Sequence, residues 1–108
     1  MNRLSLQILI CNRVGEVDVL FSSLLSQTYK EWDLILIDES TTPAIRHKHI
    51  NDLITRMKCE GHGVIYRHVK PLHNIGKSRN ICFENDEFKN NLCVRIDDDS
   101  YCDPQYLE

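Results

Sequence analysis

The sequence predicts an α/β domain with a mainly parallel sheet. Short apolar runs typical of strands alternate with segments whose apolar residues recur at helical spacing, and polar residues follow most of the strand-like runs. A chain that alternates strands and helices forms right-handed crossovers, so its strands lie parallel and their carboxyl ends share one edge. The 108 residues fit one domain spanning residues 1–108, because two independent cores need a longer chain.

The first strand is predicted over residues 4–11, where apolar side chains recur at every second position. A helix follows over about residues 16–27, with its apolar residues on one face. The continuous apolar run 34–37 predicts a second strand, which ends at Asp38 and Glu39.

Apolar residues at positions 50, 53, 54 and 57 predict the second helix, which Pro43 precedes and Gly61 and Gly63 end. Residues 64–69 predict a third strand. A short helix is expected over residues 76–84 and a fourth strand over residues 92–96. Asp103 followed by Pro104 predicts the N-cap and first position of a last helix.

Charge and cysteine usage limit the partners and the compartment. Thirteen Lys and Arg against 16 Asp and Glu give a net charge of −3, so no overall positive field attracts nucleic acid. Five cysteines without a CxxC pair indicate reduced thiols and a cytoplasmic chain. No apolar run approaches the roughly 18 residues of a spanning helix. We therefore expect contact with a membrane only through a partner or a further segment.

Polar residues gather where the predicted strands end. Asn12 and Arg13 follow the first strand, Asp38 and Glu39 follow the second, and residues 97–99 follow the fourth. In open parallel sheets, ligands bind beyond the carboxyl ends of the strands, where the strand order reverses. These strand ends are therefore the candidate site.

The three aspartates at 97–99 allow two interpretations. In an extended chain Asp97 and Asp99 share a face and Asp98 points away, so the pair can hold a cation such as Mg²⁺ or Mn²⁺ beside phosphate oxygens. The alternative, of equal weight on spacing alone, is a solvated acidic turn with one residue capping the next helix.

Other motifs carry less information. Residues 76–80 open a predicted helix, where backbone N–H groups and Arg79 suit a phosphate, although neither the P-loop nor the GxGxxG spacing is present. The five histidines have no metal-binding spacing and are expected on the surface or in loops. Trp32 and Phe21 are expected to pack in the core.

The order of these motifs resembles the N-terminal half of family 2 glycosyltransferases. The resemblance is carried by LSLQILICNR, LLSQTYKEWDLILIDES, IGKSRNICFE and VRIDDDSYCDPQYL. It implies a Rossmann-like GT-A fold, a three-layer sandwich with a mainly parallel sheet, here incomplete at its C-terminal side. It also implies transfer of a sugar from a nucleotide-sugar donor, with inversion and with UDP as the expected nucleotide.

The resemblance also implies roles for individual residues. Asp97 and Asp99 correspond to the metal-binding DxD pair, with Mn²⁺ or Mg²⁺ as the cofactor. The residues that it places around the nucleotide are Cys11, Asn12 and Arg13 beside it, Asp38 and Glu39 at the base, Arg79 at the diphosphate, Asp98 near the ribose or sugar, and Asp97 of the DxD pair.

The acceptor and the catalytic base stay unassigned, because the half of the family fold that carries them is absent from a chain of this length. The acceptor is a glycan, a lipid or a protein. A truncated sheet leaves an edge strand exposed, which predicts self-association. The alternative to an enzyme is a non-catalytic nucleotide-binding or assembly module that needs a partner chain.

Overall fold

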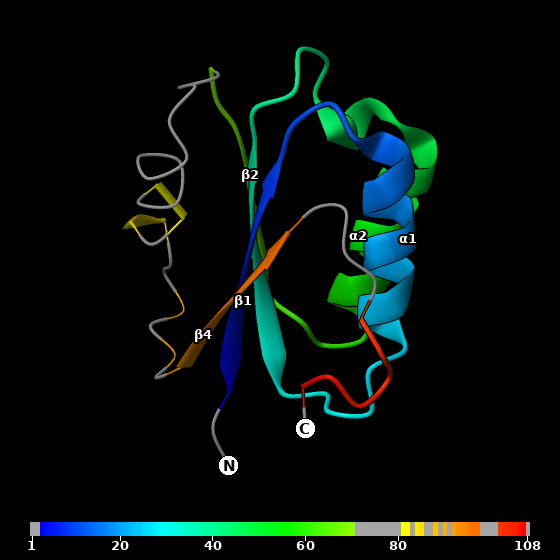
Figure 1. The fold of residues 1–108 in the computed structure, drawn as a ribbon, viewed down its shortest axis with the longest axis vertical. Coiled ribbons are helices and arrows are strands. Elements are labelled where there is room, and N and C mark those ends of the chain that lie inside the picture. Colours follow the sequence, from blue (N-terminus) through cyan, green and yellow to red (C-terminus); the bar gives the residue numbers. More distant parts are fainter. Residues whose placement is uncertain are drawn as a thin grey trace.

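The computed structural model describes residues 3–70, 81–82, 84–85, 88, 90, 92–97 and 102–107. Four strands and two α-helices alternate over most of this length (Figure 1). The elements are β1 (Leu4–Ile10), α1 (Val14–Leu25), β2 (Trp32–Asp38), the 3₁₀ turn η1 (Ala44–Arg46), α2 (Lys48–Cys59), β3 (Val64–His68) and β4 (Leu92–Asp97). The predicted α/β class and the four predicted strands are confirmed.

All neighbouring strands are parallel, in the order β3-β2-β1-β4. The chain first adds strands on one side of β1 and then crosses to its other side, so the order reverses between β1 and β4. At the carboxyl ends, Ile10 pairs with Asp38 and Leu9 pairs with Asp97. The ends of β2, β1 and β4 therefore lie side by side.

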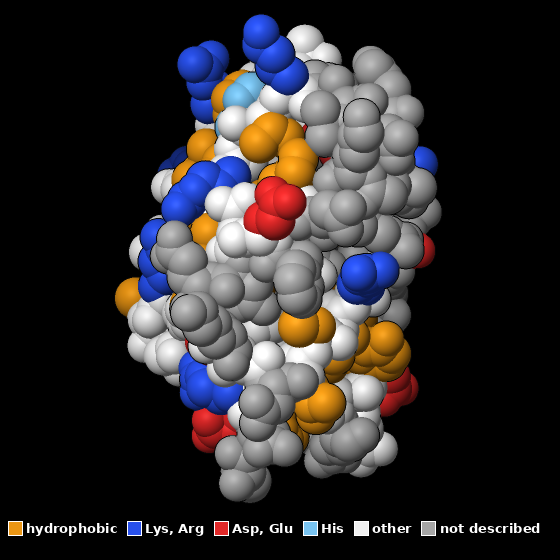
Figure 2. All heavy atoms as spheres, turned by 90° about the vertical axis from the view of Figure 1, so that its left-hand side faces the viewer, with side chains coloured by type: hydrophobic (Ala, Val, Ile, Leu, Met, Phe, Trp, Pro, Cys, Tyr) orange, Lys and Arg blue, Asp and Glu red, His pale blue; other side chains and the backbone are white. Residues whose placement is uncertain are grey.

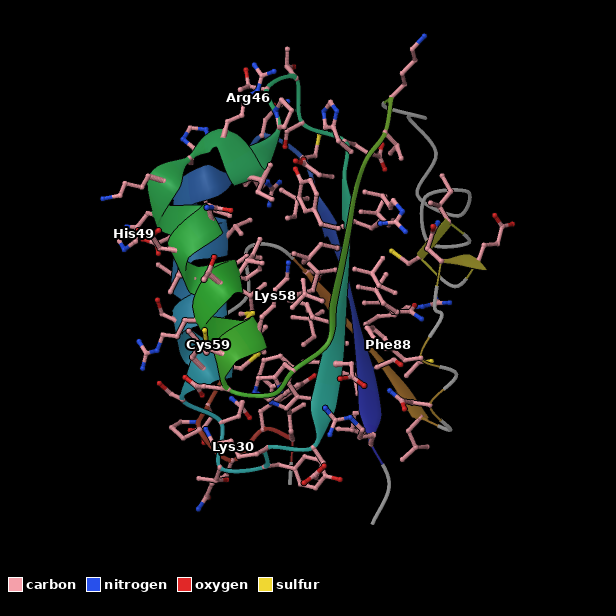
Figure 3. The ribbon with its side chains drawn as sticks, turned by 180° about the vertical axis from the view of Figure 1, so that it is seen from behind. Lys30, Arg46, His49, Lys58, Cys59 and Phe88 are labelled. Atoms are coloured by element: carbon pink, nitrogen blue, oxygen red, sulfur yellow. The ribbon has the colours of Figure 1, made fainter. Side chains whose placement is uncertain are left out.

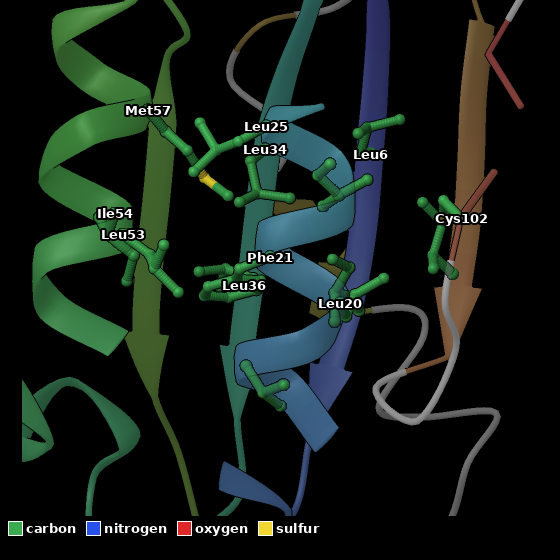
Figure 4. Packing of buried hydrophobic residues seen from close by; sticks show 14 of the residues in the cluster. Leu6, Leu20, Phe21, Leu25, Leu34, Leu36, Leu53, Ile54, Met57 and Cys102 are labelled. Carbon is green, nitrogen blue, oxygen red and sulfur yellow. The ribbon is translucent and has the colours of Figure 1, made fainter. Parts of the chain in front are cut away.

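The hydrophobic core lies between the sheet and the two helices, which cover one face of the sheet (Figure 1). Alternate side chains of β1 and β2 point toward the helices, and Leu20, Phe21, Ile54 and Met57 pack against them (Figure 4). Trp32 and Phe21 are fully buried, as predicted. Each fully buried large side chain contributes about 1.5–3 kcal/mol relative to an exposed one.

The other face of the sheet carries polar side chains near the amino ends of the strands. Arg3 donates from Nε to Asp33 Oδ2 at 3.0 Å and from Nη2 to Asp33 Oδ1 at 2.8 Å. Asn90 donates to Asp33 and to Ser5 at 3.2 and 3.0 Å. Burial by itself would raise the pKa of Asp33, but the hydrogen bonds from Arg3, Gly63 and Asn90 outweigh it and lower this pKa.

Side chains on this second face also cover the start of β3. Phe88 lies on the side of the sheet opposite Lys58 and Cys59 of α2 (Figure 3), and its ring is so close to Gly63 that a Cβ there would meet Phe88 Cε1 at 2.5 Å. In Figure 2, which views this side, hydrophobic side chains alternate with Lys and Arg side chains. The Phe88 ring therefore packs against the backbone at Gly63, beside the start of β3.

His62 lies in the loop between α2 and β3, in line with the expectation that the histidines are on the surface or in loops, and its side chain is buried. Its ring stacks on Trp32 with centroids 3.5 Å apart, and its Nδ1–H donates to the Trp32 carbonyl at 2.7 Å. Only 5% of its surface is exposed. The residue lies after Gly61, which has a φ of 94° and turns the chain back from the end of α2.

The predicted last helix is wrong in part. Asp103 does accept a hydrogen bond from the Gln105 amide at 3.1 Å, as a cap would, but residues 104–107 form a turn. The amide of Leu107 donates to Gln27 Oε1 instead of to a carbonyl one helical turn earlier. Of the predicted helix 76–84, the structure describes Ile81, Cys82 and Glu84, which are helical.

Candidate functional site

The loop after β1 is held in an unusual backbone conformation. Asn12 has a φ of 55°, in the left-handed region, which asparagine tolerates better than most residues. Its amide donates to Ser40 Oγ at 2.8 Å, and its Oδ1 accepts from the Thr41 amide at 3.0 Å. These bonds join the loops after β1 and β2 and leave the side chains of Cys11, Asn12 and Arg13 exposed.

Asp38 is the central buried group of this region. Its side chain is fully buried, and its two oxygens accept hydrogen bonds from the amides of Ser40 at 2.9 Å and Ala44 at 2.6 Å, and from the Tyr66 hydroxyl. Burial by itself would raise the pKa of Asp38, but these hydrogen bonds outweigh it and lower the pKa. The carboxylate thus fixes the turn from β2 into η1.

The end of β3 is hydrogen-bonded to the end of β2 and to the loop that follows it. Since a carbonyl only accepts, His68 Nε2 donates to the Ser40 carbonyl, at 2.7 Å, and the Val69 amide donates to the Asp38 carbonyl at 2.9 Å. Arg67, His68 and Lys70 are exposed there. Lys, Arg and His side chains gather at the upper end of the face in Figure 2. Sequence reasoning missed Ser40, Tyr66 and His68 as partners, because their contacts join residues 28 positions apart.

Glu39 and Asp97 complete the described part of the site. Glu39 is 9% exposed, and its amide donates to the Ile10 carbonyl at 2.7 Å. Asp97 is exposed at the end of β4, where it pairs in register with Leu9. The structure therefore brings together Cys11, Asn12, Arg13, Asp38, Glu39 and Asp97, whereas the predicted residues Arg79, Asp98 and Asp99 lie outside the described residues.

The described residues supply only part of a metal site. Among them, no group of three or more His, Cys, Asp or Glu side chains is arranged to hold an ion. Asp97 contributes an exposed carboxylate, a hard oxygen donor that suits Mg²⁺ or Mn²⁺. Its predicted fellow ligand, Asp99, is two residues further along the chain.

The segment that follows the acidic triplet is anchored at the far end of α1. Gln27 is fully buried, and its Nε2 donates to the Asp103 carbonyl at 2.7 Å while its Oε1 accepts from the Leu107 amide at 3.1 Å. Ser23 Oγ accepts from the Cys102 amide at 3.1 Å, and the Thr28 amide donates to the Pro104 carbonyl at 2.8 Å. Both sides of the triplet are therefore fixed.

A parallel sheet whose strand order reverses beside polar loops is the arrangement of open α/β domains, a class in which ligands bind beyond the carboxyl ends of the strands. The chain belongs to glycosyl transferase family 2, whose family model matches residues 5–108. No curated protein sequence matches the chain. Within the described residues, no helix is long and apolar enough to cross a membrane.

Solved structures share the fold. TarS 1-349 from S. aureus in complex with UDP is 17% identical, with a TM-score of 0.75 over 97% of this chain and 30% of that one. The same fragment in complex with UDP-GlcNAc is 18% identical, with a TM-score of 0.73 over 94% and 28%. The mannosyltransferase PcManGT from Pyrobaculum calidifontis, in complex with GDP-Man and Mn²⁺, is 10% identical, with a TM-score of 0.69 over 93% and 28%. The chain thus spans less than a third of these proteins, which share its GT-A fold.

Proposed function

We propose that this chain is the donor-binding part of a glycosyltransferase that transfers a sugar from a UDP-sugar, with a divalent metal and with inversion, to a glycan, lipid or protein acceptor. The observation that carries the proposal is the joining of the loops after β1 and β2 by Asn12, beside the exposed Asp97 of β4. Membership of family 2 and the nucleotide complexes of TarS support it.

The exposed groups at the strand ends suit a nucleoside diphosphate. The backbone at Cys11 and the exposed side chains of Asn12 and Arg13 are proposed to contact the nucleotide. Arg13, Arg67 and Lys70 place positive charge along this edge, which attracts phosphate oxygens. Arg79 is proposed to meet the diphosphate directly.

The base is proposed to bind beside the loop after β2, which Asp38 shapes from within. Because both Asp38 oxygens accept internal hydrogen bonds, its contribution to base binding is to hold the backbone of residues 39–41 in place. Glu39 is then the carboxylate proposed to lie nearest the base. A rigid loop costs less entropy to order when the nucleotide binds.

Asp97 and Asp99 are proposed to hold Mn²⁺ or Mg²⁺, with Asp98 directed to the ribose or the sugar. The complex of PcManGT with GDP-Man and Mn²⁺ supports divalent metal use in this fold. When bound, the ion neutralises negative charge that grows on the departing diphosphate. The residues of this chain bind and orient the donor, and the base that activates the acceptor is not among those assigned.

Calorimetric titration of the chain with UDP, in the presence and absence of Mn²⁺, tests the proposal. We expect Mn²⁺ to strengthen UDP binding, and Asp97→Ala and Asp99→Ala to remove that gain while the fold persists. Asp52→Ala is a matched control, because Asp52 is an exposed carboxylate on α2, away from the strand ends. A folded chain that binds UDP in neither condition would contradict the proposal.

A non-catalytic assembly module is the second candidate. Among the described residues, β4 pairs only with β1, so its other side is an open edge. Leu92 and Tyr106 are 52% and 53% exposed beside it. If UDP does not bind, association through this edge becomes the leading function.

A further inference from the structure

The peptide group between Ser40 and Thr41 is held on both of its sides. Its carbonyl oxygen, which belongs to Ser40, accepts a hydrogen bond from Nε2 of His68 at 2.7 Å. Its N–H, which belongs to Thr41, donates to Oδ1 of Asn12 at 3.0 Å. In a planar trans peptide these two groups point in opposite directions, so β3 holds one side of the plane and the loop after β1 holds the other. The two bonds together fix the orientation of this peptide.

The backbone conformation of Asn12 depends on the same loop. Asn12 has a φ of 55°, and its amide donates to Ser40 Oγ at 2.8 Å. A residue other than glycine keeps such a left-handed conformation only when neighbouring contacts hold it there. The hydrogen bonds of Asn12 with Ser40 and Thr41 supply such contacts. A change at the 40–41 peptide is therefore transmitted to Asn12.

His68 reaches this peptide from a paired strand. It is the last residue of β3 and pairs in register with Asp38, the last residue of β2. The next amide, that of Val69, donates to the Asp38 carbonyl at 2.9 Å. Asp38 Oδ1 accepts from the Ser40 amide at 2.9 Å. Asp38 thus holds the amide side of Ser40, and His68 holds its carbonyl side.

We propose that His68 is a positioning residue for the nucleotide: by donating to the Ser40 carbonyl it keeps the 40–41 peptide from rotating, and so keeps Asn12 in the conformation that meets the donor. The inference rests on the proposed function, because it concerns the loops that are proposed to bind UDP. Without this bond the peptide rotates and the Thr41 N–H leaves Asn12 Oδ1. The order that the loops then lack has to be supplied when the nucleotide binds, which lowers the affinity.

A small set of variants of the whole chain tests this role. His68→Leu removes the donor, and His68→Gln restores an N–H near the position of Nε2. Ser40→Ala keeps the carbonyl that His68 uses but removes the Oγ that accepts from the Asn12 amide. The double variant that combines His68→Leu with Ser40→Ala shows whether the two residues act through one network. His47→Leu is the control, because His47 is an exposed histidine whose side chain makes no capping hydrogen bond at the start of α2.

The first readout is hydrogen exchange at the amides of Asn12 and Thr41, without any ligand. We expect both amides to exchange faster in His68→Leu, because the peptide that holds them has lost one of its bonds. In His68→Gln and in His47→Leu both amides should exchange as in the wild type. This readout reports on the loops alone and does not depend on the proposed function.

The second readout is the dissociation constant for UDP at a fixed concentration of Mn²⁺, measured by calorimetry. In His68→Leu we expect the affinity to fall about 3- to 10-fold, the range that corresponds to one net hydrogen bond. Ser40→Ala should lose a similar amount, whereas His68→Gln and His47→Leu should bind as the wild type does. The double variant should lose less than the product of the two single losses, because residues in one hydrogen-bond network are not additive.

Several results would overturn the inference while the wild type still binds UDP. In one, the Asn12 and Thr41 amides exchange as before in His68→Leu, or exchange faster with no change in UDP affinity. In another, His47→Leu loses as much affinity as His68→Leu, which makes the effect one of charge at this end of the protein. In a third, the losses multiply in the double variant, which means that His68 acts independently of Ser40. A wild type that binds no UDP with or without Mn²⁺ would remove the proposed function as well.

Discussion

The hydroxyl of Tyr66 on β3 donates a hydrogen bond to the buried carboxylate of Asp38 at the end of β2. Asp38 also accepts from the amides of Ser40 and Ala44, so a single charged group connects the end of β2, the middle of β3 and the turn η1. Burial and the hydrogen bond to Asp38 raise the pKa of Tyr66 well above its ordinary value. The phenol therefore stays protonated and remains a donor through neutral pH.

Tyr66→Phe tests this bond directly. The variant keeps the ring and removes the donor, so Asp38 keeps its charge with one partner fewer. We expect a loss of about 1–3 kcal/mol in the free energy of unfolding, the range for an unsatisfied buried group. Urea denaturation of both proteins measures it, and a change within error would mean that water replaces the hydroxyl.

Acid should destabilise the fold through two carboxylates. The folded-state pKa values of Asp38 and Asp33 lie below the ordinary 3.8, so their ionised forms stabilise the fold above that pH. This contribution is lost as the pH falls from about 4 through the lowered values. Asp38→Asn should flatten the decline of unfolding free energy below about pH 4, which denaturation at a series of pH values checks. An unchanged decline would show that Asp38 titrates normally.

Two glycine substitutions should change the stability of the fold in opposite directions. At Gly63 an added Cβ would lie 2.5 Å from Phe88 Cε1 and 3.2 Å from Asp33 Oδ1, so Gly63→Ala should cost about 1–3 kcal/mol by overpacking. At Gly15, in α1, no atom lies within 4 Å of the added Cβ. Gly15→Ala should therefore stabilise by up to about 1 kcal/mol through helix propensity. Thermal unfolding of the two variants compares them, and equal effects would contradict the packing at Gly63.

Among the described strands β4 pairs only with β1, and the edge that this leaves predicts self-association. Leu92 is 52% exposed there and lines a groove of about 420 Å³ with Leu4, Cys93, Val94, Tyr106 and Leu107. Edge strands with exposed apolar side chains pair readily with a second copy. Sedimentation equilibrium should show concentration-dependent dimers that Leu92→Lys weakens. Val19→Lys is the control, since Val19 is 51% exposed on α1; a monomer at every concentration would contradict the prediction.

The order of elements was predictable because hydrophobic periodicity is a local property. Positions 50, 53, 54 and 57 were expected on one helical face, and all four side chains are buried. Helix ends were less accurate: the first helix, expected over residues 16–27, is Val14–Leu25. Residues 26–27 fall outside it, and the Gln27 side chain bonds to a segment about 80 positions away in the sequence.

The candidate site was predictable in its location but not in the direction of its side chains. The sequence marks Asp38 as a polar residue at a strand end, and only the contacts with Ala44 and Tyr66 reveal that it faces inward. His62 was expected on the surface or in a loop, and its stacking on Trp32 depends on the return of the chain after α2. Such contacts depend on tertiary structure and leave no local pattern.

The pairing of β1 with β4 has a consequence for biosynthesis. Leu4 meets Leu92, so the central strand has only one neighbour until nearly the whole described chain has left the ribosome. At about 5–20 residues per second, β1 waits several seconds with an unpaired edge. Contacts of such high sequence separation also slow folding once the chain is released. Until β4 has been synthesised, the side of β1 that faces it in the native sheet therefore has no strand to pair with.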